Sequence, residues 1–514
     1  MYLIAALLVA GCGGAGDSGG GGSAGSGSSG MSTGPPPEGS LLQSPAQLLS
    51  TVTAPTLLLQ LNLATNLQLL SLSGAPVCDV LIYKIQYETV DGANEPTTAS
   101  GALMVPTGLG SGCTGARPMV EYAHGTSTDH AFDMTDLNND EALALAALFA
   151  AQGYIVVAPN YAGYDTSTLS YHPYLIAQQQ SKDMIDALTA ARKALPLASA
   201  TLTKDNGKLY ITGYSQGGYV AMATHRAMQA AGLTVTASAP MSGPYALAAF
   251  ADAVFYGDVN GGAPISTTML LTAYQAAYGN IYSDPVQVFE PEYATGIGSL
   301  LPTTLTRSQL YSQGKLPQSA LFSLTPPAPQ FAAITPPTTP ASFAALFALG
   351  FGGGNLIQNS YRLSYLEDAQ LNPDGGFPTV TTGVPAAAPQ LAWRLALQRN
   401  DLRNWVPVAP TQLCGGALDP VVFWLNSQLI QGYWAAHATT ATSVGVLDLE
   451  STVSANDPYG SLKQDFQIAK QVLAADAVVQ GATDGGASAV LEAYHATLVA
   501  PFCLAAARTF FGNH

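Results

Sequence analysis

A serine between two glycines is the feature of this sequence with the clearest chemistry. Gly213, Ser215 and Gly217 form the pattern GxSxG, after a strand-like apolar run at residues 209–212 and before a helix-like run that begins at Gly218. A serine on such a sharp strand-to-helix turn has strained backbone, and glycine at the flanking positions avoids collisions with neighbouring elements. Because the turn exposes the hydroxyl, Ser215 is predicted to be a nucleophile.

A serine nucleophile needs a histidine to accept its proton and a carboxylate to orient that histidine. Chains with this kind of elbow carry the three residues in the order serine, acid, histidine. Position in the chain therefore favours His495, which precedes a helix-like run at residues 497–511, over His437 and the terminal His514.

Asp419 is the predicted acid. A strand-like run at residues 410–413 leads through two glycines to Asp419, which would place its carboxylate at the carboxyl edge of the sheet. Ligands bind at that edge in open α/β sheets. Asp448 and Glu450, after a second strand-like run at residues 442–447, are the alternative acids.

Two backbone amides are expected to bind the oxyanion that forms when a serine attacks a carbonyl. One is the amide of Gln216, the residue after the nucleophile, and the other is that of Thr126, in the loop that follows Tyr122. His124, in the same loop, is interpreted as a histidine that hydrogen-bonds its neighbours rather than as a catalytic group.

Strands and helices alternate before the serine. Strand-like runs at residues 117–123 and 154–159 flank a helical pattern at residues 141–152, and the GxSxG turn follows the next strand and helix. This order predicts an α/β fold with a doubly wound, mostly parallel sheet.

Longer stretches accompany these residues. They are YAHGT at 122–126, VVAPNYAGYD at 156–165, SYHPYLIAQQQSKDMIDALTAARKAL at 170–195, GYSQGG at 213–218 and LALQRNDLRNWVPVAPTQLCGGALDPVV at 395–422. Together they resemble the secretory lipase family of the α/β-hydrolases, which includes fungal lipases of the A type and bacterial secreted relatives. The resemblance implies an α/β-hydrolase fold, with a mostly parallel central sheet flanked by helices, and hydrolysis of carboxylic esters through Ser215, Asp419 and His495.

The resemblance also implies a large, mainly helical cap insertion over the active site, at about residues 247–394. Within it, Phe343 and Phe347 lie in an apolar stretch that we expect either to bind the acyl chain or to form the core of the cap. Tyr214, beside the nucleophile, is a third candidate for substrate binding.

The amino end predicts export. Residues 1–11 resemble the signal peptide of a bacterial lipoprotein, which implies cleavage before Cys12 and lipid attachment to its thiol. A secretory signal without lipidation is the alternative. The Gly, Ser and Pro content of residues 12–45 predicts a disordered tether, followed by a catalytic domain at residues 46–514. The predicted location is the bacterial outer membrane or cell surface, or the medium.

Four further cysteines suit disulfides in an exported protein. Of the three possible pairings we favour Cys78 with Cys113 and Cys414 with Cys503, because the second would join the segments that carry the acid and the base. Buried free thiols are the alternative.

Composition limits the kinds of partner that the protein can bind. The 514 residues include 17 Lys and Arg and 33 Asp and Glu, which gives a net charge of −16 and disfavours nucleic acid as a partner. No spacing of ligands predicts a metal, no glycine pattern predicts a nucleotide, and no cofactor is expected. No apolar run predicts a membrane-spanning helix.

The expected substrate is a small-molecule, lipid or polymer ester. A serine peptidase of the same fold, for which Glu290 and Glu292 would be the acidic pair, and a catalytically inactive surface lipoprotein are the alternatives.

Overall fold

The computed structural model describes residues 36–514, except 64–67, 199, 375–382 and 439–442. The predicted signal peptide, Cys12 and most of the predicted tether lie outside the described residues. The N–H groups of Gly39 and Leu42 donate to the carbonyls of Glu88 and Gln86, each at 2.8 Å. The folded unit therefore begins before residue 46, the boundary expected from the sequence.

The described residues contain one sheet of nine strands in the order β1-β2-β3-β5-β4-β6-β7-β8-β9. β1, β2, β3 and β5 pair antiparallel in succession, and the six strands from β5 to β9 in that order are parallel. The strands are β1 Gln47–Val52, β2 Asp79–Val90, β3 Pro96–Thr107, β4 Ala116–Ala123, β5 Ile155–Pro159, β6 Lys204–Tyr214, β7 Ala237–Met241, β8 Thr411–Gly415 and β9 Val444–Asp448. The predicted mostly parallel sheet is confirmed.

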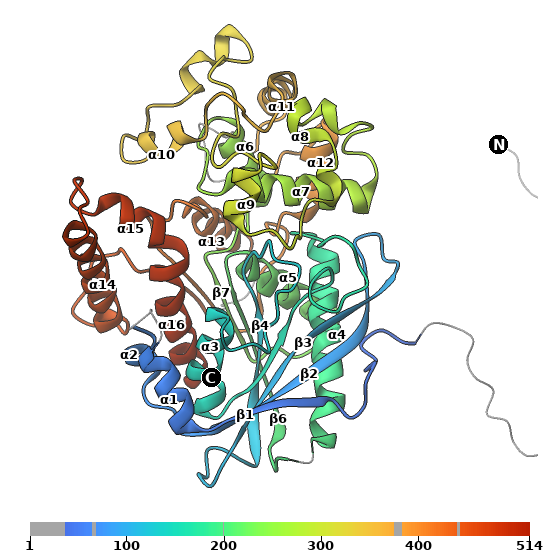
Figure 1. Cartoon of the computed structure of the whole chain (residues 1–514), viewed down its shortest axis with the longest axis vertical. Coiled ribbons are helices and arrows are strands. Elements are labelled where there is room, and N and C mark those ends of the chain that lie inside the picture. The colour runs from blue at the N-terminus through green and yellow to red at the C-terminus, as the bar shows by residue number, and fades with distance from the viewer. Residues whose placement is uncertain (1–35, 64–67, 199, 375–382, 439–442) are drawn as a thin grey trace, which may run out of the picture. The chain divides into compact units, whose positions relative to one another are not determined.

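Helices cover both faces of the sheet (Figure 1). One apolar core lies between the sheet and α4 and α5, and the other lies between the opposite face and α3 and α16. Alternate residues of a strand point to opposite faces, so the two cores take alternate positions of β4. The helices around the sheet are α1 Ala54–Leu63, α2 Gln68–Ser73, α3 Asp140–Leu148, α4 Ala177–Ala194, α5 Gln216–Ala230, α13 Leu425–His437, α14 Gly460–Val479, α15 Ala487–Ala493 and α16 Ala500–Gly512.

The cap, residues 247–394, gathers beyond one end of the sheet in Figure 1. Its Thr303 exchanges backbone hydrogen bonds with Thr128 and His130, in the loop after β4, and its Gly261 donates to the carbonyl of Pro420 at 2.8 Å. The cap therefore contacts both loops that the sequence assigns to the active site. Its helices are α6 Leu247–Phe255, α7 Ala263–Tyr278, α8 Pro291–Ala294, α9 Arg307–Ser312, α10 Ala344–Leu349, α11 Asn359–Leu371 and the start of α12 Ala392–Asn400.

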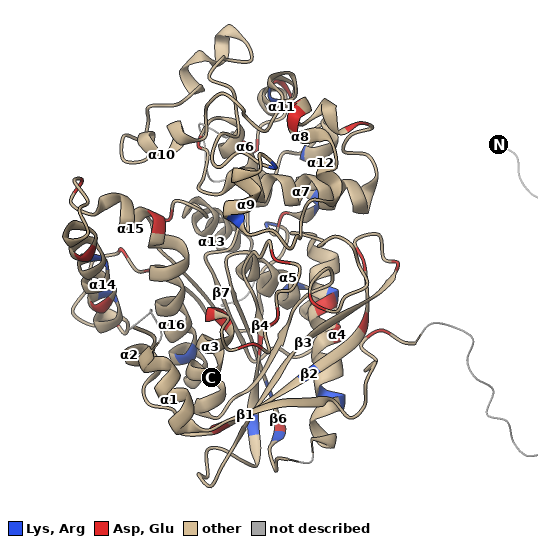
Figure 2. Cartoon of the chain, viewed as in Figure 1, with Lys and Arg blue, Asp and Glu red and all other residues tan. Residues whose placement is uncertain are grey.

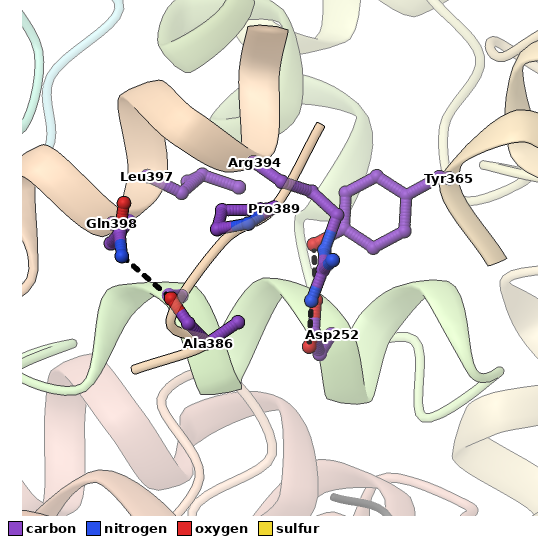
Figure 3. Close-up of a pocket in the computed structure, with 8 residues that line it drawn as sticks. Asp252, Tyr365, Ala386, Pro389, Arg394, Leu397 and Gln398 are labelled. Carbon is purple, nitrogen blue, oxygen red and sulfur yellow. Dashed lines mark hydrogen bonds and ion pairs between the residues drawn. The ribbon is translucent and has the colours of Figure 1, made fainter. Parts of the chain in front are cut away.

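Buried ion pairs join the cap helices to one another. Arg394 of α12 lies 2.9 Å from Asp252 of α6 and 3.1 Å from Asp368 of α11, and Tyr365 donates to Asp252 at 2.7 Å. Figure 3 shows Arg394 beside the Tyr365 ring, in a small pocket that holds none of the predicted catalytic residues. The RNDLRNW stretch forms a second buried group, in which the Arg403 guanidinium lies 2.7 Å from Asp374 of the cap and 2.9 Å from Asp401. Its distinctive residues therefore hold the cap in place.

Two disulfides, Cys78–Cys113 and Cys414–Cys503, have the predicted pairing. The second joins β8, which leads to Asp419, to α16. Among the described residues one helical run, Ala487–Gly512, is long and apolar enough to cross a membrane, but 56% of its most apolar window is buried inside the protein. Because α16 packs on the sheet, we assign this run to the core.

Candidate active site

The turn between β6 and α5 holds Ser215 in a strained backbone conformation, with φ 61° and ψ −122°. A side chain at Gly213 would place its Cβ 2.6 Å from the carbonyl oxygen of Ala123, and one at Gly217 would overlap the same oxygen. Only glycine fits at these two positions. This close packing against the end of β4 fixes where the serine hydroxyl lies.

A continuous hydrogen-bond path runs from the serine to a buried aspartate. Ser215 Oγ lies 2.8 Å from His495 Nε2, and His495 Nδ1 lies 2.7 Å from Asp419 Oδ2. The other carboxylate oxygen of Asp419 accepts the N–H groups of Val421 and Val422 at 2.9 and 3.0 Å. With Nδ1–H donating to Asp419, the unprotonated Nε2 can accept the proton of the serine.

The alternative acids make other contacts. Asp448 accepts the backbone N–H groups of Ala417 and Glu450 at 3.0 and 2.9 Å, which shapes the loop that leads to Asp419. The Glu450 carboxylate binds Lys470 and accepts the Tyr494 hydroxyl at 2.6 Å. Of the three carboxylates, only Asp419 hydrogen-bonds to His495.

His495 lies within a helix rather than ahead of one, which corrects the sequence-based expectation. It stands in a π-helical turn, Tyr494–Val499, between α15 and α16. Such turns occur often at functional sites, because the extra residue redirects a side chain. The hydroxyl of Tyr214 donates to the carbonyl of His495 at 2.5 Å, and its ring packs 5.0 Å from the imidazole. Tyr214 is buried and its hydroxyl holds the backbone of the histidine, while substrate binding by Tyr214 stays a prediction.

The two amides expected to bind an oxyanion are both available. Among residues 36–514 as described, the N–H groups of Gln216 and Thr126 have no hydrogen-bond partner within the protein. The neighbouring N–H of Gly125 donates to both carboxylate oxygens of Glu141, at 3.2 and 3.1 Å. Glu141 was not found from the sequence, because nothing in its local pattern shows that it reaches back to this loop.

Comparison with known proteins agrees with the fold. Residues 143–255 match the prolyl oligopeptidase family. The crystal structure of the rice cell wall degrading esterase LipA from Xanthomonas oryzae is 26% identical, with 84% of this chain and 96% of that chain covered and a TM-score of 0.62. A structure from Legionella pneumophila is 18% identical, with 92% and 97% covered and a TM-score of 0.63, and it supports the fold alone. No curated protein matches in sequence.

This chain is a hydrolase of the α/β-hydrolase superfamily. The resemblance to esterases and lipases of that superfamily, inferred from motifs, is thereby confirmed at the level of the fold and of hydrolysis.

His124 has a structural place in this α/β-hydrolase. Its ring nitrogens lie 2.6 and 3.0 Å from the carbonyl oxygens of Gly125 and Asn160, and its ring stacks on Tyr161 at 4.0 Å. Burial lowers the pKa of His124 to about 4, while the hydrogen bonds from its ring to the two carbonyls act in the opposite direction. These contacts hold the loop that carries Thr126.

The two predicted cap phenylalanines meet the loop of the acid in this hydrolase. Phe347 is buried, and its ring lies 5.8 Å from both Phe343 and Phe423. Phe423 follows Asp419 by four residues and was missed because its partners come from the cap. Substrate binding by Phe343 and Phe347 stays a prediction, and packing of α10 against the acid loop is what their contacts provide.

Proposed function

We propose that the protein is an exported serine carboxylic ester hydrolase, an esterase or lipase, that acts through an acyl-enzyme on Ser215. The observation that carries this proposal is the hydrogen-bond path through Ser215, His495 and Asp419, at 2.8 and 2.7 Å. A hydroxyl, an imidazole and a carboxylate in this order form a triad that needs no cofactor.

The proposed reaction has two halves. His495 Nε2 takes the proton of Ser215 as Oγ bonds to the ester carbonyl carbon, and the tetrahedral intermediate collapses when His495 returns that proton to the leaving alkoxide, which departs as the alcohol. Water then attacks the acyl-serine, with its proton passing to His495, and collapse releases the carboxylic acid and restores the serine. Asp419 keeps Nδ1–H in place and stabilises the imidazolium. The amides of Gln216 and Thr126 bind the oxyanion in both halves.

An ester substrate and an exported location have separate support. The similar protein from Xanthomonas oryzae is named as a cell wall degrading esterase. The two disulfides suit an oxidising compartment. We propose lipid attachment at Cys12, with the Gly-, Ser- and Pro-rich residues between Cys12 and the folded unit as the tether that holds the catalytic domain away from the membrane. A net charge of −16 argues against nucleic acid as a partner.

Hydrolysis of p-nitrophenyl esters from acetate to palmitate tests the proposal. Ser215→Ala should lower kcat by about 10⁶-fold, because the nucleophile and its partners act as a unit. Ser181→Ala removes another buried hydroxyl, which bonds only within its own helix, and should leave kcat unchanged. Stoichiometric labelling of Ser215 by a fluorophosphonate reports the nucleophile directly. Folded protein that neither hydrolyses esters nor accepts the label would instead be an inactive scaffold.

A serine peptidase is the second candidate, because residues 143–255 match the prolyl oligopeptidase family. The acidic pair expected for peptide binding lies at the start of α8 in the cap, with Glu290 as its N-cap residue and Glu292 in its first turn. Glu290 accepts the Asn355 side-chain amide at 3.5 Å, and Glu292 is exposed. Cleavage of dipeptide p-nitroanilides at rates above those for esters would favour the peptidase.

A further inference from the structure

The HPY segment, His172 to Tyr174, is the distinctive stretch that the proposed triad does not explain. It lies in the connection between β5 and α4, and both His172 and Tyr174 are buried. The carbonyl of Leu175, the next residue, accepts the hydroxyl of Tyr219 from α5 at 3.1 Å. The segment is therefore tied to the helix that follows the nucleophile.

His172 binds the side chain of one predicted oxyanion donor. Its Nε2 lies 2.6 Å from Nε2 of Gln216, and its Nδ1 lies 2.9 Å from the carbonyl oxygen of Ala162. A carbonyl can only accept, so Nδ1 carries the proton and Nε2 accepts the N–H of the Gln216 amide. Burial lowers the pKa of His172 to about 3, which keeps the ring in this neutral form. The buried Gln216 side chain is thus held at one end by a histidine of fixed tautomer.

Tyr174 binds the side chain of the other predicted donor. Its hydroxyl lies 2.9 Å from Oγ1 of Thr126. Tyr161 gives a second link between the segment and the loop of Thr126. Its ring lies 5.5 Å from that of His172, and its hydroxyl donates to the carbonyl of His124 at 3.1 Å. Two residues of one segment therefore reach the start of α5 and the loop after β4, and the two residues that they bind, Gln216 and Thr126, are 90 positions apart in the sequence.

We propose that the HPY segment positions the backbone amides of Gln216 and Thr126 as the two oxyanion donors, an inference that rests on the proposed function. Neither His172 nor Tyr174 touches the reacting atoms. Each binds the side chain of Gln216 or Thr126, and the backbone N–H of that residue is left free for the oxyanion. An oxyanion hole stabilises the transition state only if its donors are preorganised, so a device that joins both donors bears on kcat more than on substrate binding.

The test uses two variants that keep the ring and remove its hydrogen bonds, Tyr174→Phe and His172→Phe. Loss of a whole oxyanion donor costs about 10² to 10³ in kcat. A displaced donor should cost less, so we expect kcat for p-nitrophenyl esters to fall about 10-fold for Tyr174→Phe and up to about 100-fold for His172→Phe, with KM within about twofold. The inhibition constant of phenylboronic acid, whose serine adduct is tetrahedral, should rise by the same factor as kcat falls.

Two matched controls separate positioning from general destabilisation. His225→Phe removes a buried histidine of α5 that contacts Ser238, and Tyr459→Phe removes a hydroxyl that donates to Gln412. Both should leave kcat unchanged per active site, with sites counted by fluorophosphonate labelling. The double variant Thr126→Val with Tyr174→Phe should lower kcat no more than Tyr174→Phe alone, because both substitutions break the same hydrogen bond.

An unchanged kcat in Tyr174→Phe and His172→Phe, or a rise in KM alone, overturns the proposed positioning role of the HPY segment. If His172→Phe does not fold, Tyr174→Phe and the pair with Thr126→Val decide the question. Full activity of Ser215→Ala would instead overturn the proposed function, so the two failures are distinct.

Discussion

Glu121 is a single residue whose surroundings predict a stability effect. It lies within β4, fully buried, and neither carboxylate oxygen has a hydrogen-bond partner in the described part of the chain. Burial raises the pKa of Glu121 well above its ordinary value. The folded state therefore keeps a proton that the unfolded chain loses above about pH 4, so Glu121 makes stability fall as pH rises toward its folded pKa, by about 1.4 kcal/mol per pH unit.

Glu121→Met should therefore raise the free energy of unfolding at pH 8, by about 1 to 3 kcal/mol, because it removes a buried polar group without partners and nearly keeps the volume. Urea denaturation at pH 5 and pH 8 measures this, and the gain should be smaller at pH 5. Glu492→Met, at an exposed position of α15, is the control and should change little. A variant less stable than the parent at both pH values would show that the carboxyl has a stabilising role.

At the same scale, the sequence could predict the residues whose chemistry depends on chain order and could not predict those that depend on contacts. Ser215, Asp419 and His495 follow from a turn motif and the order of the three groups, and the structure brings them together. The contact of the Tyr214 hydroxyl with His495 could not be inferred, because the two residues lie 281 positions apart. The partners of His172 and Glu141 were missed for the same physical reason.

The C-terminal elements depend on the Cys414–Cys503 disulfide. It joins β8 to α16 across 89 residues, and both the loop of Asp419 and the turn of His495 are next to it. By chain entropy, closing a loop of this length is worth about 4.6 kcal/mol, against about 3.8 kcal/mol for the 35 residues between Cys78 and Cys113. Removal of the Cys414–Cys503 disulfide should therefore cost more stability than removal of the other disulfide. It should also disturb the position of Asp419 relative to His495.

We therefore expect Cys414→Ala with Cys503→Ala to lower both Tm and kcat, and Cys78→Ala with Cys113→Ala, the matched control, to lower Tm alone. Thermal unfolding and p-nitrophenyl ester hydrolysis at 25 °C measure the two effects. Equal kcat in the two double variants would mean that packing alone holds acid and base together.

Element boundaries show where sequence patterns stop being informative. The predicted strands and helices around the serine are present, because their apolar periodicity matches one face of a sheet or helix. The helix near the C-terminus begins before His495 instead of after it, since Ala487–Ala493 continues through the π-helical turn. A π-helical turn leaves the apolar pattern almost unchanged, so its position could not be inferred.

For the whole molecule, charge is sparse and buried titratable groups decide how stability depends on pH. Figure 2 shows Lys and Arg spread over many elements, in a chain where charged residues are only 10%. Burial lowers the pKa of His124 and His225 to about 4 and that of His172 to about 3. Burial raises the pKa of three aspartates to about 6, and these are Asp183, Asp258 and Asp374.

The two sets act in opposite directions between pH 6 and pH 4. As pH falls, the unfolded chain protonates its histidines while the folded state does not, so each buried histidine lowers stability by about 1.4 kcal/mol per pH unit below about pH 6.5. Over the same range the folded state protonates its aspartates first, which raises stability. His225 isolates the first effect, because it is buried outside the proposed active site, hydrogen-bonds to Ser238 and packs its ring on Trp405. Urea denaturation of His225→Phe at pH 4, 5, 6 and 7 should give a slope of unfolding free energy against pH that is lower by about 1.4 kcal/mol per unit between pH 6 and 4. His437→Phe, at an exposed position, should keep the parent slope. Equal slopes in the two variants would mean that His225 takes up its proton in the folded protein as readily as in the unfolded chain.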